Sequence, residues 1–282
     1  KVDEYDENGT VEQRLEAYLN RGSILSMMDS YVSALTDFDE AVEIIQLMES
    51  VGDNSDPGTY VKTYVSRGEL QMSDGADGMV EDYAMAAKRL DELKPTSRHY
   101  DEKSIIVMCI SCCENLIDED FPGNIKPFFD KAEIMLFSKN GVWHRNRYVE
   151  ALNLMGQADQ NMKRYAESLE HLNRSISLAQ ELMKEEALDD ETALVFALTL
   201  RGDIKIKDGL LEEALRDREA SIAILEVLLS YNRPETKELL MQLHRETSSL
   251  LIEMNETEEA EKHLLRALEL NVSEATLSRI DN

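Results

Sequence analysis

Apolar residues recur along this chain with the period of an α-helix. In the first such segment they fall at i, i+3, i+4, i+7 and i+10, namely at Leu15, Tyr18, Leu19, Gly22 and Leu25. A stripe of this kind lines one face of a helix and predicts that this face is buried. The following segment carries a second stripe, at Ala34, Leu35, Phe38, Ala41, Val42 and Ile45. The two segments together predict a helical hairpin.

The hairpin pattern repeats at a nearly constant interval. Each copy has a marker position in its first helix, occupied by Gly in four copies, and a small, a large and another small residue follow in the second helix. The markers are Gly22, Gly68, Cys112, Gly156, Gly202 and Ser248, separated by 46, 44, 44, 46 and 46 residues. Small residues let two helices approach closely, and large ones fill the remaining space. Since one hairpin cannot bury its apolar face alone, we expect six hairpins to stack around a shared core.

Turn-forming residues separate the copies. They are Asp56-Pro57-Gly58, Lys94-Pro95-Thr96, Asn140-Gly141, Asp189-Asp190 and Asn232-Arg233-Pro234. Asp and Asn cap helix starts, and Pro fits the first helical turn. We therefore predict one array over residues 1–282, with no separate catalytic domain. Its repeats are expected at about 11–58, 59–98, 99–141, 142–188, 189–233 and 234–272, followed by a short C-terminal cap at 273–282.

The repeat resembles the tetratricopeptide repeat. That family has an aromatic residue or Leu, a small residue four positions later, and then Ala, an aromatic residue and Ala in the second helix. The first copy matches this signature with Tyr18, Gly22, Ala34, Phe38 and Ala41. The usual repeat has about 34 residues, whereas this one has about 45 and is similar to extended variants of the family. The resemblance implies an all-α, right-handed superhelical solenoid of about six hairpins; HEAT-like or other helical hairpins are the structural alternative.

The resemblance also implies a function: a non-enzymatic scaffold that binds a peptide or protein segment in a concave groove lined by the first helix of each hairpin. The residues expected on that surface are Asn20, Ser23, Lys62, Ser66, Glu69, Asn153, Gln157, Gln160, Asn161, Asp203 and Arg245. The four amides of the fourth repeat share one helix face, and amides can both donate to and accept from a peptide backbone. This row is the strongest candidate for a peptide site, although a solvated groove wall is the simpler interpretation.

The charge balance narrows the choice of partner. The chain has 30 Lys and Arg against 57 Asp and Glu, a formal net charge of −27. Nucleic acids and anionic membranes attract basic surfaces, so neither is expected as a partner. A basic or apolar protein or peptide fits better, unless the charge only keeps the surface soluble. Two alternative functions stay open: a structural or oligomerisation module, with a homodimer formed through the ends of the array, and a regulatory region of a larger protein.

Residues with chemical reactivity do not form a recognisable site. Cys109, Cys112 and Cys113 are expected to be buried small hydrophobes on one helix rather than a thiol pair, which suits a reducing, cytoplasmic location. The five histidines are scattered without ligand spacing, and phosphate-binding and hydrolase motifs are absent from the sequence. We therefore expect no metal, no cofactor and no catalysis. The basic segment 139–147, with Trp143, is expected to pack between hairpins rather than anchor a partner.

The sequence contains no run of about 18 apolar residues, so no membrane contact is expected from this segment. The numbering begins at Lys1 without a Met. A removed leader or anchor upstream therefore stays open.

Overall fold

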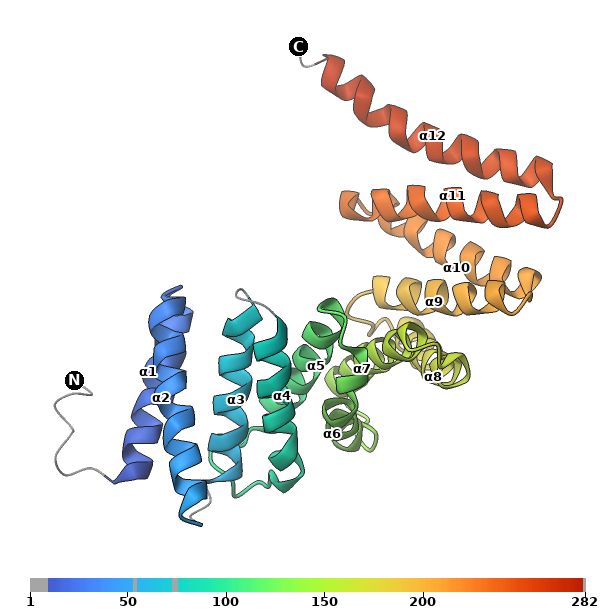
Figure 1. Cartoon of the computed structure of the whole chain (residues 1–282). Coiled ribbons are helices and arrows are strands. Elements are labelled where there is room, and N and C mark those ends of the chain that lie inside the picture. The colour runs from blue at the N-terminus through green and yellow to red at the C-terminus, as the bar shows by residue number, and fades with distance from the viewer. Residues whose placement is uncertain (1–9, 53–54, 73–75, 281–282) are drawn as a thin grey trace. The chain divides into compact units, whose positions relative to one another are not determined.

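In the residues that the structure describes, α-helices follow one another, joined by turns, loops and the 3-10 helices η3, η4 and η5 (Figure 1). The structure, a computed structural model, describes residues 10–52, 55–72 and 76–280, and it describes side chains within 10–52, 55–72 and 77–271. Over these residues the expected all-α class is confirmed, because the regular elements are helical throughout. Successive helices pack against each other in pairs, and these pairs are the predicted hairpins.

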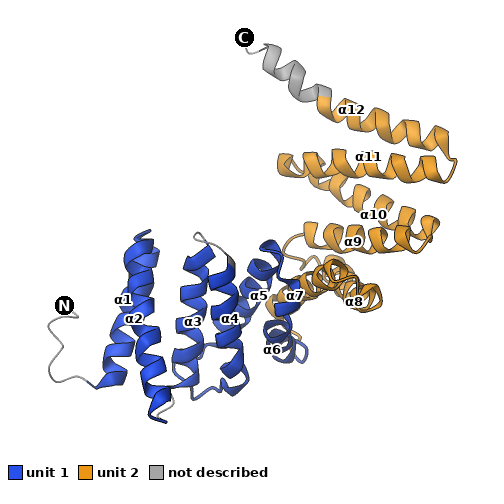
Figure 2. Cartoon of the chain, viewed as in Figure 1, with its two compact units in different colours: residues 1–138 blue, residues 139–282 orange. Residues whose placement is uncertain are grey.

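Contacts group the hairpins into two compact units, residues 1–138 and 139–282 (Figure 2). Our prediction was one array over 1–282, and the division falls beside the Asn140-Gly141 breaker between the third and fourth repeats. Unit 1 contains three hairpins, α1–α2, α3–α4 and α5–α6. Their elements are α1 (Val11–Met27), α2 (Tyr31–Ser50), α3 (Pro57–Gln71), α4 (Ala76–Arg89), η3 (Leu90–Glu92), α5 (Glu102–Asp118), η4 (Pro122–Asn124) and α6 (Lys126–Leu136).

Unit 2 contains the other three hairpins, α7–α8, α9–α10 and α11–α12. Their elements are α7 (Val142–Asn161), α8 (Tyr165–Lys184), α9 (Thr192–Lys207), α10 (Leu211–Ser230), η5 (Pro234–Thr236), α11 (Lys237–Glu253) and α12 (Thr257–Ile280). The backbone of α12 continues through residues 273–280, where we had expected a separate cap. The sequence there contains neither Gly nor Pro, so nothing interrupts the helix.

The marker glycines sit where the two helices of a hairpin cross. A Cβ atom added at Gly22 would lie 3.0 Å from the ring of Phe38, and one added at Gly156 would lie 2.8 Å from Leu172. Phe38 is 1% exposed and Leu172 is fully buried. The large residue of the second helix therefore occupies the space that the missing side chain leaves, as the repeat pattern predicted.

The turn between the two helices has the same form in four of the described hairpins. Seven residues after the marker the chain adopts a left-handed backbone conformation, at Asp29, Lys163, Gly209 and Asn255. The next residue donates its backbone N–H to a carbonyl five residues back, for example Ser30 to Leu25 at 2.9 Å and Arg164 to Asp159 at 2.8 Å. This closure terminates the first helix and satisfies one of its last carbonyls.

A buried ion pair joins the two helices in three of the hairpins. Arg67 donates from Nε and Nη2 to the carboxylate of Asp82 at 2.8 and 2.6 Å, and these bonds raise the pKa of Arg67. Asp82 is 1% exposed. The equivalent pairs are Arg21–Asp37 and Arg201–Asp217. Removing one partner of such a pair leaves a buried charge without compensation, which is strongly destabilising. Each pair therefore couples the stability of the two helices of its hairpin.

Candidate functional site

A groove with a volume of about 400 Å³ opens between α3 and α5 in unit 1. We call it the α3–α5 groove. Its walls come from three segments: Gly58, Val61, Lys62, Val65, Ser66 and Glu69 of α3, Leu93 and His99 of the connection that follows α4, and Ser104, Ile105 and Met108 of α5. Both helices are the first of their hairpins, so the groove lies on the surface where the resemblance placed peptide binding. It includes the expected site residues Lys62, Ser66 and Glu69.

The floor of the groove is apolar. Val61 and Val65 lie one helical turn apart on α3 and are 2% and 3% exposed, and Ile105 on α5 is 5% exposed. These side chains pack between the helices, while the half-buried Met108 remains accessible from the groove. An apolar floor with a few polar groups around it is the usual composition of a ligand-binding site.

Two opposite charges stand over this floor. Lys62 and Glu69 lie seven residues apart on α3, which places their Cα atoms about 10 Å apart along the helix axis. Within the described part of the chain, neither side chain has a hydrogen-bond or ion-pair partner. Solvent reaches Glu69, yet protein surrounds it on several sides, and the loss of hydration raises the pKa of its carboxyl group. The groove thus holds a cation and an anion that the protein itself does not neutralise.

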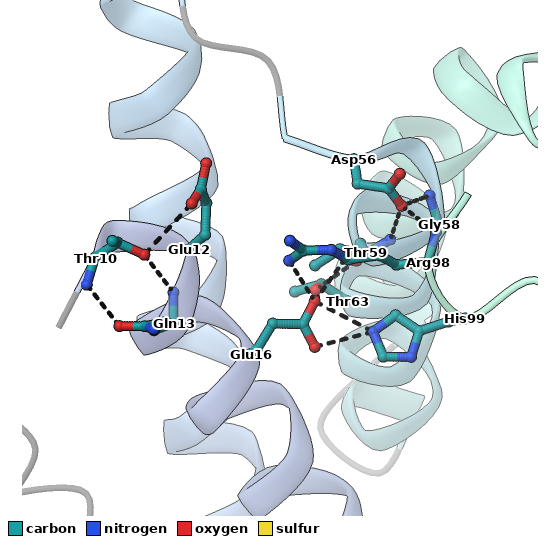
Figure 3. Close-up of polar contacts among 10 residues, drawn as sticks. All are labelled: Thr10, Glu12, Gln13, Glu16, Asp56, Gly58, Thr59, Thr63, Arg98 and His99. Atoms are coloured by element: carbon teal, nitrogen blue, oxygen red, sulfur yellow. Dashed lines mark hydrogen bonds and ion pairs between the residues drawn. The ribbon is translucent and has the colours of Figure 1, made fainter. Parts of the chain in front are cut away.

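The loop that carries His99 is held by polar contacts with α1 and α3 (Figure 3). His99 lines the groove, and its Nε2 lies 3.1 Å from Oε2 of Glu16 on α1. The same carboxylate accepts a hydrogen bond from Oγ1 of Thr59 at 2.8 Å and lies 3.5 Å from Nη1 of Arg98. Glu16 therefore ties the loop at 94–100 to both α1 and α3.

The start of α3 is shaped to accept this loop (Figure 3). Asp56 caps the helix by accepting from the backbone N–H groups of Gly58 and Thr59, at 2.9 and 3.3 Å, and it also accepts from the backbone N–H of Arg98 at 2.9 Å. A Cβ atom at Gly58 would lie 1.7 Å from the carbonyl oxygen of Arg98. Only glycine leaves room for this approach, so Asp56-Pro57-Gly58 is a docking point as well as a helix start.

The amide row of the fourth repeat lies on α7 in unit 2, and its first member has a structural role. Asn153 is 5% exposed; its Nδ2 donates to the carbonyl of Ala193 at 2.9 Å, and its Oδ1 accepts from Ser175 at 2.5 Å. These bonds occupy the amide that we had assigned to a peptide backbone. Gln157 and Gln160 are half-buried and Asn161 is exposed. A peptide-binding role for these three stays a prediction.

The other expected site residues are dispersed. Asn20 is exposed on α1, and the hydroxyl of Ser23 is half-buried and donates to the carbonyl of Leu19 at 2.8 Å. In unit 2, Asp203 forms an ion pair with Arg218, whereas Arg245 is exposed on α11. The structure therefore gathers Lys62, Ser66 and Glu69 into one groove, and a binding role for the remaining candidates stays a prediction.

The basic segment at 139–147 is held within unit 2. Arg145 pairs with Glu185, and Arg147 pairs with Glu150 at 2.7 Å and with Asp189 at 3.4 Å. These arginines tie α7 to the connection between α8 and α9. The packing of Trp143 between hairpins, which we favoured over a partner anchor, stays a prediction.

The three cysteines are buried on α5, as expected. Cys109 and Cys112 are fully buried and Cys113 is 3% exposed, all as free thiols. Loss of hydration raises the pKa of Cys109 to about 12. Since the thiolate is the reactive form, these side chains act here as small apolar residues.

The described residues lack two other kinds of feature, a metal cluster and a membrane-spanning helix. They contain no group of three or more His, Cys, Asp or Glu side chains placed to hold a metal ion. Nor does any helix among them have the length and apolar character needed to cross a bilayer.

Comparison with known proteins bears on the nature of the repeat. Residues 149–182, which run from α7 through most of α8, match the tetratricopeptide repeat family. This segment is a tetratricopeptide repeat. It includes the Gly156–Leu172 crossing and the left-handed turn at Lys163, both of which recur in other hairpins. The suspected family resemblance is thereby confirmed, and the 44- to 46-residue spacing shows an extended form of the repeat. Comparison with curated protein sequences gave no significant match.

Solved structures share this architecture at low sequence identity. The chain is similar to BtubC (BKLC) from P. vanneervenii, with 12% identity, a TM-score of 0.58, and coverage of 95% of this chain and 93% of that one. It is similar to aspartyl phosphate phosphatase F from Bacillus subtilis, with 13% identity, a TM-score of 0.56, and coverage of 95% and 66%. MamA has 16% identity, a TM-score of 0.50, and coverage of 74% and 96%. At such identities these likenesses establish the fold alone.

Sequence reasoning missed two groups of residues. One is the set of buried aspartates, although each lies 15 or 16 residues after the Arg with which it pairs, as Asp82 does after Arg67. Aligning the repeats could have revealed that interval. The other is the His99 loop with Glu16, which are 83 residues apart. No local pattern connects them, so only the folded chain could.

Proposed function

We propose that this chain is a non-enzymatic protein-interaction scaffold, and that its α3–α5 groove binds an extended peptide segment of a partner. The observation that carries this proposal is the pairing of an apolar floor with two unneutralised charges, Lys62 and Glu69. A floor made of Val61, Val65 and Ile105 can take apolar side chains out of water, which is the main source of binding free energy.

The fold supports the same conclusion. The family resemblance places peptide binding on the first helices of the hairpins, and the groove lies between two of these, α3 and α5. A basic or apolar segment remains the expected partner, since the chain has a net charge of −27. The proposal moves the peptide site from the amide row on α7 to the second and third hairpins.

The test is selection of peptides from a random phage-displayed library on the immobilised full chain. Ser66→Trp would fill the groove without changing the charge, because Ser66 is half-buried and lines it. Ser33→Trp on the exposed side of α2 is the matched control. We expect enriched peptides that bind the unmodified chain and the control but bind Ser66→Trp at least tenfold more weakly. Peptides that bind all three forms equally would show that the groove is not the site.

A second function, self-association, is favoured by the exposed face of α12. Leu264 and Leu268 are 43% and 57% exposed, whereas the equivalent residues of α8, Leu172 and Ile176, are 0% and 4% exposed because the next hairpin covers them. We propose that another copy can cover this face. Light scattering over a range of concentrations should then show dimers that Leu268→Glu abolishes. A strict monomer at every concentration would contradict this.

A further inference from the structure

The two unneutralised charges of the α3–α5 groove point to the kind of segment that it selects, an inference that rests on the proposed function. We propose that the groove prefers a polyproline II segment carrying one acidic and one basic side chain three residues apart. The acidic group would lie beside Lys62 and the basic group beside Glu69, with apolar residues between them over the groove floor.

The spacing of Lys62 and Glu69 along α3 distinguishes between two extended backbone conformations of a ligand. Lys62 and Glu69 share one face of α3 and are separated by two helical turns, about 10 Å. A polyproline II helix has three residues per turn and a rise of about 3.1 Å per residue, so residues i and i+3 share a face and lie about 9 Å apart. In a β-strand residues i and i+3 point to opposite faces. The polyproline II form is therefore the better geometric match.

The composition of the floor agrees with such a segment. The two residues between the charges would face Val65, Ile105 and Met108, which form an apolar surface. Proline or other apolar residues at these positions would be removed from water there. A polyproline II backbone has no internal hydrogen bonds and is already ordered before binding, so it loses little conformational entropy.

The electrostatics of the groove favour one group of each sign. Glu69 is exposed to solvent but crowded by protein, which raises the pKa of its carboxyl group, and it has no cationic partner among the described residues. A basic side chain from a ligand would supply the missing partner, and Lys62 would do the same for an acidic one. A segment with two like charges would place one of them against a group of the same sign.

The test uses four amidated, acetylated hexapeptides and the full chain, at low salt to limit screening. The peptides are Gly-Asp-Pro-Pro-Lys-Gly, Gly-Lys-Pro-Pro-Asp-Gly, Gly-Asp-Pro-Pro-Asp-Gly and Gly-Lys-Pro-Pro-Lys-Gly, and affinities are measured by calorimetry. We expect one of the two mixed peptides to bind best, with each like-charge peptide about fivefold weaker. Shortening the better mixed peptide by one proline should weaken it by a similar factor.

Reversing either charge of the groove should then change which of the four peptides binds best. Glu69→Lys should favour the diacidic peptide and Lys62→Glu the dibasic one, regardless of the direction in which the peptide lies. Glu81→Lys and Lys88→Glu, on exposed positions of α4, are matched controls that should keep the preference of the unmodified chain.

Equal binding of all four peptides, an unmoved preference in the variants, or no binding of any of them would overturn the inference. The proposed function fails separately, if the library selection yields no peptide that Ser66→Trp excludes. Selected peptides that depend on the groove but lack paired charges would retain the function and reject the charge rule.

Discussion

Unit 1 and unit 2 contain the same hairpin but use its polar residues differently. On α3 in unit 1, Lys62 and Glu69 stand over an apolar groove without partners among the described residues. On α7 in unit 2, Asn146 bonds to the carbonyl of Ala187 and to the backbone N–H of Asp189, both at 2.8 Å, and Asn153 is equally engaged. These two asparagines of α7 thus bind the connection to the next hairpin and its first helix, whereas the two charges on α3 remain available to a ligand.

The difference shows why a row of polar residues on a helix face is not by itself a binding site. An amide that satisfies a buried carbonyl is part of the fold, because leaving that carbonyl unpaired costs free energy. In the sequence, the amide row of α7 and the Lys62–Glu69 pair of α3 both appear as polar residues along one face of a first helix. Four changes, ordered by expected effect, test the comparison.

The largest effect is expected for Gly58→Ala in unit 1. The new Cβ would overlap the carbonyl oxygen of Arg98, which lies 1.7 Å from its position, so the loop and the start of α3 must separate. We expect a loss of about 3 kcal/mol in the free energy of unfolding, measured by denaturation in urea. Gly202→Ala in unit 2 is the control, since its Cβ would meet atoms no closer than 3.6 Å. That variant should be neutral or up to about 1 kcal/mol more stable. Equal stability of the two variants would show that the loop does not pack on Gly58.

The second effect concerns the amide row. Asn153→Ala removes two hydrogen bonds of a side chain that is 5% exposed, so we expect a loss of about 2 kcal/mol in unfolding free energy. Gln157→Ala, on the same helix, should change it by less than about 0.5 kcal/mol. Neither should weaken peptides selected on the unit 1 groove. If Asn153→Ala leaves stability unchanged but abolishes peptide binding, the amide row is the site after all.

The third effect is a pH dependence located in unit 2. His244 and His263 face each other with their Nδ1 atoms 2.9 Å apart, an arrangement that needs one protonated and one unprotonated nitrogen. Burial lowers the pKa of both rings, and His263 lowers that of His244 further. The surrounding charges are Glu226, Arg266, Glu219 and Glu259.

Because the folded pKa values lie below the unfolded value of about 6.5, the unfolded chain takes up protons first as the pH falls. The unprotonated pair therefore contributes its full stabilisation of the folded state above about pH 6.5, and this contribution is lost as the pH falls. The free energy of unfolding changes by at most about 1.4 kcal/mol per pH unit for each additional proton that the unfolded chain binds. Urea denaturation at several pH values between 7.5 and 5.5 should show that the free energy of unfolding depends less steeply on pH in His263→Asn than in the unmodified chain. An equally steep dependence in both would show that the histidine pair is not its cause.

The smallest effect is expected for Glu16→Gln, which weakens the contacts to Arg98 and His99. These residues are partly exposed, so the loss of stability should be only about 0.5 to 1 kcal/mol. The local effect should be clearer: hydrogen exchange at residues 94–100 should become faster, while exchange in unit 2 stays unchanged. Glu12→Gln, one turn earlier on α1, is the control. Unchanged exchange in the loop would mean that Glu16 does not hold it.

Much of the fold could be predicted because its information is local. Gly22 and Gly156 identify the helix crossings, and Asp56-Pro57 identifies a helix start that the structure confirms. The resemblance also led us to expect Lys62, Ser66 and Glu69 on one binding surface, and all three line the α3–α5 groove. The groove could not be, because Leu93, His99 and Ile105 join it from segments that are distant in sequence. The same holds for Asn153, whose partner Ala193 lies 40 residues away.

The sequence by itself determined the helices, their pairing and the repeat, since helical period, small-residue spacing and capping act over a few turns of chain. The tertiary structure decided which polar groups remained free for a ligand. Whether a side chain is satisfied depends on what neighbouring hairpins bring within about 3 Å of it, and that distance is set only when the hairpins stack.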